Sequence, residues 1–351
     1  MTANIHTLTS PRWPKAAGAM AAALPHAAPA GVLSPDFWGS YVVTMRPYLL
    51  FLSAITGIAG MSLAPAAPLP DLLLLSLAFF LSYGLGQALT DCFQTDTDSL
   101  SSPYRPLVQG KVRRRDVMAV SVAGLVGGGM VLALYSPANI LLAALGIAGL
   151  ATYTPFKRRW WAGPFWNAWI VVVLCLLGYV SALGATGTSF DLSPVLLSTM
   201  FAVLFGYGNF VLAGYFKDVS ADRATGYRTL PVVFGLRVSS LVSDAFAALT
   251  VSACGAALYF ALSARELGPE HAFAPLFWIA GTALTMIGQM RLHRVRSEAE
   301  AHRGIGPVLH TYLLLLSAVA LAQEPAWSPG IILLHAGFLV TMRLRPMKQQ
   351  I

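Results

Sequence analysis

Apolar runs long enough to cross a bilayer recur along the whole chain. The hydrocarbon core of a bilayer is about 30 Å thick, and a helix of about 20 apolar residues crosses it. Only 11% of the residues are charged, against about 25% in an ordinary soluble domain. The runs therefore predict an all-α, polytopic membrane bundle of nine spans with a short tenth run. They lie at residues 39–62, 71–91, 116–136, 138–155, 163–184, 192–216, 238–262, 272–290 and 306–323, and the tenth at 329–342.

The amino-terminal residues 1–37 differ in composition from the runs that follow. They are rich in Ala and Pro and carry no acidic residue before Asp36. A short apolar stretch at residues 16–24 resembles a signal-peptide core. Repeated prolines oppose regular structure, which favours a disordered tail instead. The sequence thus predicts a disordered segment 1–37 followed by a single transmembrane domain over residues 38–345.

Basic residues are distributed asymmetrically between the runs. Of the 23 Lys and Arg residues, all except Arg265 lie before or near the start of the first run, in even-numbered connections, or after the tenth run. Cytoplasmic loops carry the excess of Lys and Arg, so the N-terminus and the even connections are predicted to face the cytoplasm. The basic residues after the tenth run fit this side only if that run crosses. Because the basic residues lie in short connections, the net charge of +8 does not indicate a nucleic-acid partner.

Acidic residues are scarce, yet they gather in two clusters. Asp91, Asp96 and Asp98 follow the second run, and Asp218 and Asp222 follow the sixth. Crowded carboxylates repel one another unless a cation neutralises them, and Mg²⁺ prefers oxygen ligands of this kind. The alternative is an ordinary pair of salt-bridged helix ends. Two such clusters on one membrane side favour a metal site.

Helical spacing indicates which of these carboxylates share a face. On a continuous helix Asp218 and Asp222 are four residues apart and lie on one face. Asp91 and Asp98 are seven apart and also share a face, whereas Asp96 projects to another side. Gln94 lies on the side of Asp91 and Asp98, where it offers a neutral oxygen.

Each cluster is followed by an Arg-containing turn of related sequence. These turns read "DSLSSPYRPLVQGK" and "DRATGYRTLPVVFG", which suggests a weak internal repeat four spans apart. Arg105, Lys111, Lys217 and Arg228 are predicted as direct ligands of a phosphate group. Carboxylate-held Mg²⁺ beside such residues suits a diphosphate, because the metal neutralises the charge that develops on a diphosphate leaving group.

An apolar tail on such a diphosphate would lie among the spans. Tyr153 is a candidate to face an allylic cation, which an aromatic ring attracts. Trp160 and Trp161 are better explained as aromatic belt residues at the membrane interface. Asn209 and Tyr215 precede the second cluster on the sixth run and are predicted to face the cavity. For Asn209, an interhelical hydrogen bond is an equal alternative.

These motifs resemble those of the UbiA superfamily of intramembrane prenyltransferases, over roughly residues 40–325. The segment "YFKDVSADRATGYRTLPVVFG" is similar to the family's second aspartate signature, which places Asp218 and Asp222 on its metal-binding carboxylates. "SPYRPLVQG" resembles the family's Pro-x-Arg-Pro loop, which implies a diphosphate or substrate-loop role for Arg105. "YTPFK" resembles the segment after the fourth span, which implies substrate contact for Tyr153 and Lys157.

The first aspartate motif departs from the family pattern. The family has Asn-Asp, a second Asp three residues on and a third four residues later, whereas this chain reads Thr90-Asp91, Gln94 and Asp98. The first site has therefore lost one negative charge. Asp96 either compensates through a shift of register or has no role.

The resemblance implies a Mg²⁺-dependent membrane enzyme. Asp91, Asp98, Asp218 and Asp222 are the implied metal ligands, and with Tyr153 the catalytic residues. The enzyme would ionise a prenyl diphosphate and let an aromatic or lipidic acceptor attack the cation. The superfamily also includes terpene cyclases, in which the prenyl chain attacks its own cation without an acceptor. A third hypothesis, an anion transporter, predicts no Mg²⁺-dependent release of diphosphate. Neither the chain length nor the acceptor follows from the sequence.

Overall fold

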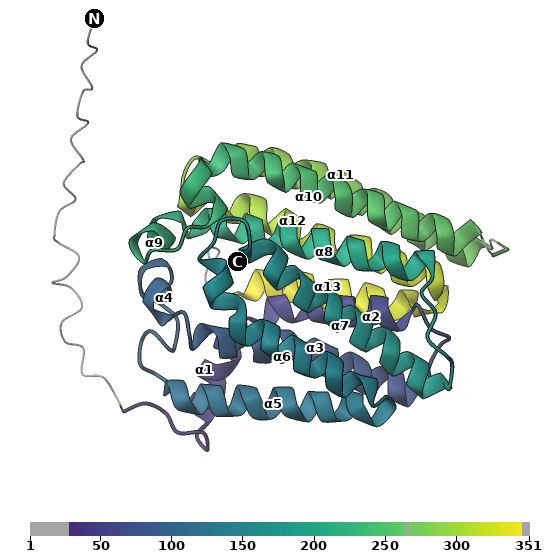
Figure 1. Cartoon of the computed structure of the whole chain (residues 1–351), viewed down its shortest axis with the longest axis horizontal. Helices are drawn as coiled ribbons and strands as arrows, with labels where there is room; N and C mark the ends of the chain where they lie inside the picture. The colour runs from purple at the N-terminus through teal and green to yellow at the C-terminus, as the bar shows by residue number, and fades with distance from the viewer. Residues whose placement is uncertain (1–27, 264, 267, 346–351) are drawn as a thin grey trace, which may run out of the picture.

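The computed structural model describes residues 28–345 except 264 and 267, and this part of the chain is almost entirely helical (Figure 1). The longer helices pack side by side, and two short ones, α4 and α9, lie together at one end. The helices are α1 (Pro35–Met45), α2 (Leu50–Met61), α3 (Leu69–Asp91), α4 (Thr95–Ser101), α5 (Arg114–Tyr135), α6 (Ala138–Lys157), α7 (Gly163–Thr186), α8 (Pro194–Gly214), α9 (Val219–Ala224), α10 (Leu230–Ser263), α11 (Phe273–His293), α12 (His302–Gln323) and α13 (Ser328–Leu344).

Nine helical segments in the described part are long and apolar enough to cross a membrane, and a bent pair at the start would make ten. The short tenth run of the sequence forms one of the nine, α13, which follows the 3-10 helix Pro325–Trp327. The all-α membrane bundle predicted from the apolar runs is confirmed. α13 packs against the 3-10 helix Pro47–Leu49 near the first break in the chain.

The first apolar run, predicted as a span over residues 39–62, is not one continuous helix. α1 ends at Met45, Arg46 has a left-handed backbone with φ 54°, and the next helical segment starts at Pro47, so the pair is bent by 44°. A residue before proline is pushed out of the α-helical conformation, and Pro47 has no N–H to continue the ladder. The break turns Arg46 into the bundle.

The first helix begins before the boundary expected from composition. Ser34 accepts a hydrogen bond from the N–H of Phe37, and Pro35 occupies the first helical position, both favoured at a helix start. The N–H of Ala30 donates to the carbonyl of Lys111 at 2.9 Å. Residues 1–27 of the predicted disordered tail lie outside the described residues.

The helices differ in how deeply they are enclosed. In α12 the most apolar stretch is 78% buried, whereas in α5, α6, α11 and α13 it is 17% buried. α2 and α7 approach closely where a Cβ on Gly60 would collide with the carbonyl of Cys175, as small residues allow in membrane bundles. The enclosed helices form the core, and the others present apolar side chains to lipid.

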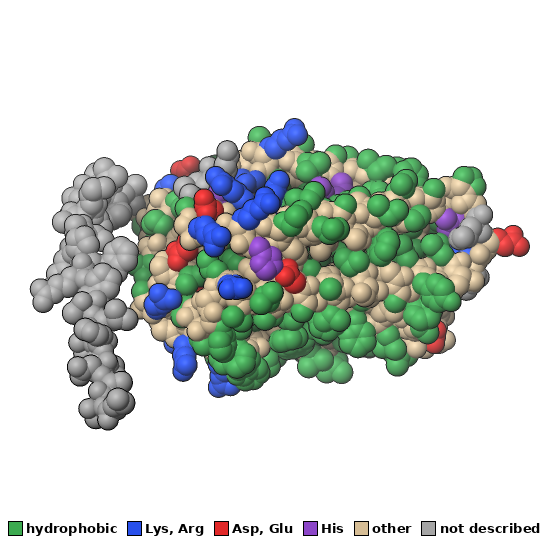
Figure 2. Space-filling view, turned by 90° about the horizontal axis from the view of Figure 1, so that it is seen from above, with side chains coloured by type: hydrophobic (Ala, Val, Ile, Leu, Met, Phe, Trp, Pro, Cys, Tyr) green, Lys and Arg blue, Asp and Glu red, His purple; other side chains and the backbone are tan. Residues whose placement is uncertain are grey.

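One end of the bundle carries the polar connections. The hydroxyls of Thr97 in α4 and Thr225 beside α9 lie 3.2 Å apart, which joins the loops after α3 and α8. On the face shown in Figure 2, Lys and Arg side chains gather toward this end. Gly235 has φ 78°, a conformation that favours glycine, and kinks α10 so that its long part starts after it.

Candidate active site

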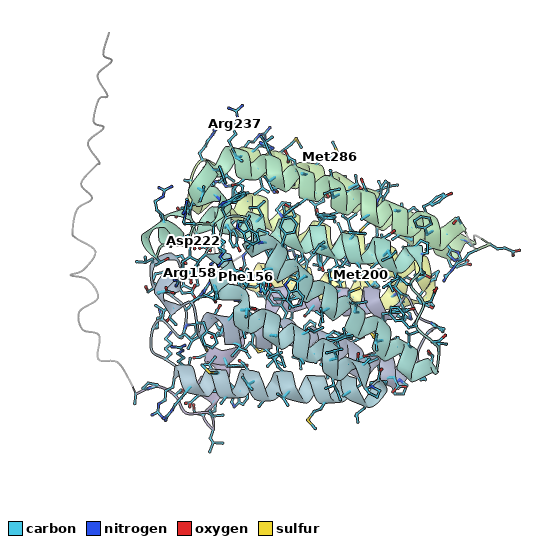
Figure 3. The ribbon with its side chains drawn as sticks, in the orientation of Figure 1. Phe156, Arg158, Met200, Asp222, Arg237 and Met286 are labelled. Atoms are coloured by element: carbon cyan, nitrogen blue, oxygen red, sulfur yellow. The ribbon has the colours of Figure 1, made fainter. Side chains whose placement is uncertain are left out.

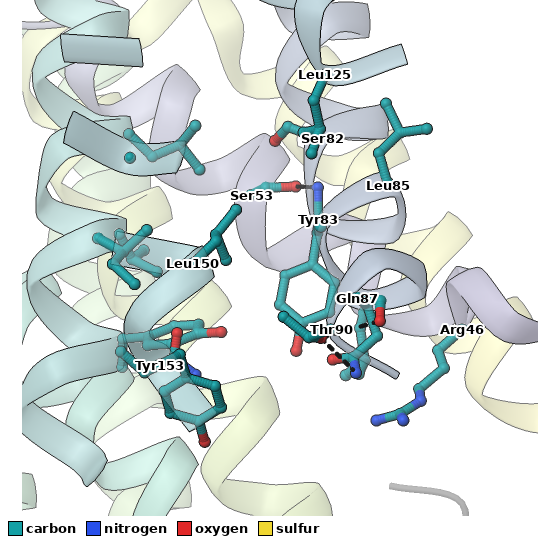
Figure 4. A pocket seen from close by; sticks show the side chains of 18 of the residues that line it. Arg46, Ser53, Ser82, Tyr83, Leu85, Gln87, Thr90, Leu125, Leu150 and Tyr153 are labelled. Carbon is teal, nitrogen blue, oxygen red and sulfur yellow. Dashed lines mark hydrogen bonds between the residues drawn. The ribbon is translucent and has the colours of Figure 1, made fainter. Parts of the chain in front are cut away.

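A cavity of about 280 Å³ opens at the end where α4 and α9 lie and extends between α3, α5, α6, α7 and α8. In Figure 4, Arg46, Gln87 and Thr90 lie toward one end of the labelled lining, Tyr83 and Leu150 lie in the middle, and Leu125 lies toward the other end. The end with the charged side chains is called the mouth below. The charged residues that line it are Arg46, Asp91, Asp98, Arg105, Lys157, Lys217 and Asp218.

The first acidic motif does not lie on one continuous helix, as the spacing argument assumed. α3 ends at Asp91 and α4 begins at Thr95. Asp91 and Asp98 nevertheless meet, because Arg105 Nη1 contacts Asp98 Oδ2 directly and lies 3.7 Å from Asp91 Oδ1. Burial raises the pKa of the Asp98 carboxyl, and the Arg105 charge opposes this. Asp96 is half exposed and lies 3.8 Å from Arg158 instead.

Asp91 has two partners that the sequence analysis did not identify. Arg46 Nη2 donates to both carboxylate oxygens at 2.9 Å, and Gln87 Nε2 donates to Oδ1 at 2.6 Å. All three side chains line the cavity. The signal for Arg46 was present in the sequence as an Arg-Pro dipeptide inside an apolar run, which marks a helix break.

The second motif does not lie on one continuous helix either, because its first carboxylate, Asp218, precedes α9. Asp218 occupies the N-cap position of α9 and lines the cavity, whereas Asp222 lies within α9, is fully buried and is not among the lining residues. Thr229 donates to Asp222 Oδ2 at 3.1 Å, but Oδ1 accepts no hydrogen bond. Burial raises the pKa of the Asp222 carboxyl to about 6, although Lys157, 3.7 Å from Oδ1, opposes the shift. In Figure 3, Asp222 and Arg158 both lie at the end of the bundle where α4 and α9 lie.

Lys157 joins the two motifs. Its Nζ donates to Gln94 Oε1 at 3.4 Å and lies 3.7 Å from Asp222 Oδ1. It also lies 5.6 Å and 5.1 Å from the ring centres of Tyr215 and Tyr227, which suits a cation–π contact. Gln94, the residue that departs from the family pattern, therefore contacts the lysine that faces the second motif.

Tyrosines surround the level just below the mouth. The hydroxyls of Tyr153 and Tyr215 lie 3.1 Å apart, and both side chains line the cavity. Tyr83 and Tyr207 line it as well, from α3 and α8. The sequence analysis identified Tyr153 and Tyr215 but not the other two, whose apolar runs gave no local signal. These four residues are called the tyrosine collar below.

Three of the predicted substrate ligands are not brought to the cavity. Lys111 and Arg228 are exposed, and neither lines it. Asn209 accepts a hydrogen bond from Ser243 at 2.6 Å, so it joins α8 to α10, the alternative that its sequence context left open. The two related turns therefore differ: Arg105 enters the mouth, and Arg228 does not.

The donors at the mouth fit a hard divalent cation. Asp91, Asp98 and Asp218 line the mouth with carboxylate oxygens, and Asp222 Oδ1, which is buried outside the lining, accepts no hydrogen bond. Such oxygens are the ligands that Mg²⁺ prefers. Within the described residues, no three acidic, His or Cys side chains are already arranged around a common point. The basic residues beside them suit a bound phosphate.

Known proteins match most of the chain. The model of the UbiA prenyltransferase family matches residues 53–305. The digeranylgeranylglyceryl phosphate synthase of Halobacterium salinarum is 34% identical over 170 residues, 48% of this chain and 59% of that protein. The synthase of the same name from Thermococcus kodakarensis is 31% identical over 217 residues, 61% of this chain and 76% of that protein. The first match thus spans little more than half of the relative's length.

Solved structures share the fold. The apo structure of a UbiA homolog from Aeropyrum pernix K1 aligns with a TM-score of 0.61 and 22% identity, covering 84% of this chain and 98% of that one. The structure of a UbiA homolog from Archaeoglobus fulgidus bound to GPP and Mg²⁺ aligns with a TM-score of 0.59 and 18% identity, covering 81% and 99%.

Proposed function

The chain belongs to the UbiA prenyltransferase family, and from that premise we propose that it ionises a prenyl diphosphate and transfers the prenyl group to an acceptor. The observation that carries the proposal is one continuous cavity with a charged mouth, a tyrosine collar and an apolar interior. A prenyl diphosphate has a matching order of parts: a charged diphosphate, then the reacting carbon, then an apolar chain. The homolog from Archaeoglobus fulgidus binds GPP and Mg²⁺, which supports this substrate class.

In this proposal the mouth holds the diphosphate. Arg105 and Lys217 line it and offer positive charges to the phosphate oxygens, and Lys157 stands between the motifs. Asp91, Asp98, Asp218 and Asp222 are the proposed Mg²⁺ ligands. When bound, the metal neutralises charge that develops on the leaving diphosphate. Arg46 fixes Asp91 through two hydrogen bonds, so it positions this carboxylate.

The collar and the apolar interior protect the cation. Tyr153 and Tyr215 line the cavity at the level where the reacting carbon would lie, and aromatic rings attract a cation. Apolar side chains beyond them exclude water, which would otherwise capture the cation. The bond from carbon to diphosphate breaks and diphosphate leaves, and a new bond forms to the acceptor, whose attacking group releases its proton.

The names of the curated relatives guide the choice of acceptor. Because they are digeranylgeranylglyceryl phosphate synthases, we propose a glyceryl phosphate lipid as the acceptor, with an aromatic acceptor as the second candidate. The test incubates purified protein in lipid nanodiscs with prenyl diphosphates, Mg²⁺ and each acceptor, and identifies products by mass. Transfer products that need both Mg²⁺ and an acceptor support the proposal. Full turnover in excess chelator refutes the metal requirement, and cyclised products without acceptor indicate a cyclase.

We also propose that the mouth faces the cytoplasm, because all except one of the Lys and Arg residues lie on that predicted side. Ser99 in α4 is exposed, and Cys92, Cys175 and Cys254 are buried. Ser99→Cys therefore provides a single accessible thiol at the mouth end. Labelling of inverted vesicles but not of intact cells with an impermeant thiol reagent supports the orientation, and the reverse result refutes it.

A further inference from the structure

Beyond the tyrosine collar, the cavity continues as an apolar arm between α3, α5, α6 and α7. The arm is defined as the part of the lining deeper than Tyr153 and Asn167. Its walls include Leu85, Leu125, Leu132, Gly146, Leu150 and Leu177. No charged residue lines this part, so it suits an apolar ligand.

The depth of the arm follows from helix geometry. On α6 the lining runs from Tyr153 to Ala143, and on α7 from Asn167 to Leu177. Ten residues of helix rise roughly 15 Å. Three bonds of an extended chain span about 3.5 Å, so the four bonds of a prenyl unit span about 5 Å. The arm therefore takes about three prenyl units, or four with the reacting unit at the collar.

The far end of the arm is closed by packed side chains. Phe79, Leu132 and Leu177 line it and also belong to a buried cluster with Met61 and Leu75. These residues are at most 6% exposed, so a chain that reaches them cannot continue in the same direction.

Glycines in the walls fall into two kinds. A Cβ on Gly124, which lines the cavity on α5, would lie 2.7 Å from Leu85 on α3, so this glycine allows the two helices to approach. A Cβ on Gly128 or Gly146 meets no atom within 4 Å, although both residues line the cavity. At these two positions the missing side chain leaves space in the arm.

The two cavity glycines lie at different depths. Gly146 is seven residues from Tyr153 on α6, roughly 10 Å beyond the collar. Gly129, next to Gly128 on α5, would place a Cβ 3.7 Å from Ala143. Gly128 therefore lies near the level of Ala143, at roughly 15 Å.

We propose that this arm sets the length of the prenyl chain, with Gly128 and Gly146 as the residues that keep it open for a chain of four prenyl units. The inference rests on the proposed function and specifies its substrate. A leucine at position 146 removes space for the third and fourth units. A leucine at position 128 removes space for the fourth unit alone.

The test uses geranyl, farnesyl, geranylgeranyl and nonaprenyl diphosphates as substrates of the full chain in nanodiscs. For Gly146→Leu we expect kcat/KM to fall about tenfold or more with the farnesyl and geranylgeranyl substrates, and to stay near wild type with geranyl. For Gly128→Leu the loss is expected with geranylgeranyl only. Wild type is expected to turn over the nonaprenyl substrate poorly, because the arm is closed. Unreactive thiolodiphosphate analogues of each length, measured by thermal stabilisation, should follow the same order.

Gly127→Leu is the matched control. Gly127 lies next to Gly128 on α5, is exposed, meets no atom within 4 Å of an added Cβ, and does not line the cavity. Its variant should match wild type at every length, and retained geranyl turnover shows that the other variants fold. Equal losses at all lengths, or nonaprenyl turnover equal to that of geranylgeranyl, would overturn the inference. If wild type releases no diphosphate from any substrate, the proposed function fails instead, and analogue binding still tests the arm.

Discussion

The two acidic motifs have related sequences but different surroundings. In the first, Asp91 and Asp98 are both paired with arginines, and Arg46 and Gln87 add hydrogen bonds to Asp91. In the second, Asp222 has one neutral hydrogen-bond donor, a lysine 3.7 Å away, and an oxygen that accepts no hydrogen bond. The first motif is thus largely neutralised by the chain itself, whereas the second retains capacity for an added cation.

This difference in surroundings supports different roles for the two motifs. A carboxylate that already balances a buried arginine gains less from a metal than one with a free oxygen, because its charge is compensated. We therefore propose that the second motif is the stronger metal site. In the same proposal the first motif holds Arg105 in place for the diphosphate, which agrees with its loss of one carboxylate at Gln94. The following predictions test this contrast, from the largest effect to the smallest.

The largest effect is expected at the second motif. Asp222→Asn removes the negative charge of the carboxylate whose Oδ1 accepts no hydrogen bond. It should lower turnover by a factor of about a hundred or more, because an interaction that stabilises the transition state is lost. Asp218→Asn should act similarly. Kinetics across Mg²⁺ concentrations, with thermal stability as a check on folding, measure this. Near-normal activity of Asp222→Asn would remove the second motif from the proposed metal site.

Within the first motif, Asp98 and Asp96 provide an internal comparison. Asp98→Asn weakens the buried ion pair with Arg105. It should lower kcat/KM for the diphosphate by roughly thirtyfold, which corresponds to the low end of the free-energy cost of breaking a buried charge pair. Asp96→Asn loses only a half-exposed contact with Arg158 and should stay within about twofold of wild type. If the two variants are equally impaired, the proposed roles of the first motif are wrong.

The arginines of the two related turns give a smaller contrast. Arg105→Gln should raise KM for the diphosphate roughly tenfold, because a charge-assisted hydrogen bond is lost at the mouth. Arg228→Gln alters an exposed side chain outside the cavity and should change nothing measurable. Steady-state kinetics of both variants decide this. Equal effects would mean that the two halves bind the substrate symmetrically.

The smallest effect is expected at Gln94. Gln94→Asp restores a carboxylate beside Lys157. The added negative charge should lower the Mg²⁺ concentration for half-maximal activity by about threefold, an effect that corresponds to the modest free energy of one partly exposed ion pair. The product should not change. Mg²⁺ titration and product mass are the measurements, with Gln94→Asn as the neutral control. An altered product would show instead that the neutral amide belongs to a different reaction after ionisation.

The sequence by itself determined the elements and their chemistry. Run lengths predicted the spans, including a short tenth run that forms α13, because hydrocarbon thickness sets the length of a helix that must satisfy its own backbone. The aspartate motifs and the Pro-x-Arg-Pro loop predicted the family, since they specify a local pattern of ligands. These inferences depend only on residues close together in the chain.

The tertiary structure alone decided which residues meet. Arg46 reaches Asp91 because a break at Pro47 redirects the first helix, and Lys157 lies between Gln94 and Asp222 because α4, α6 and α9 converge at one end. Whether Arg105 or Arg228 enters the mouth depends on the path of each loop, not on its related sequence. Long-range ion pairs and the depth of the apolar arm follow from the way the helices pack. They cannot be predicted from the spacing of residues along a single helix.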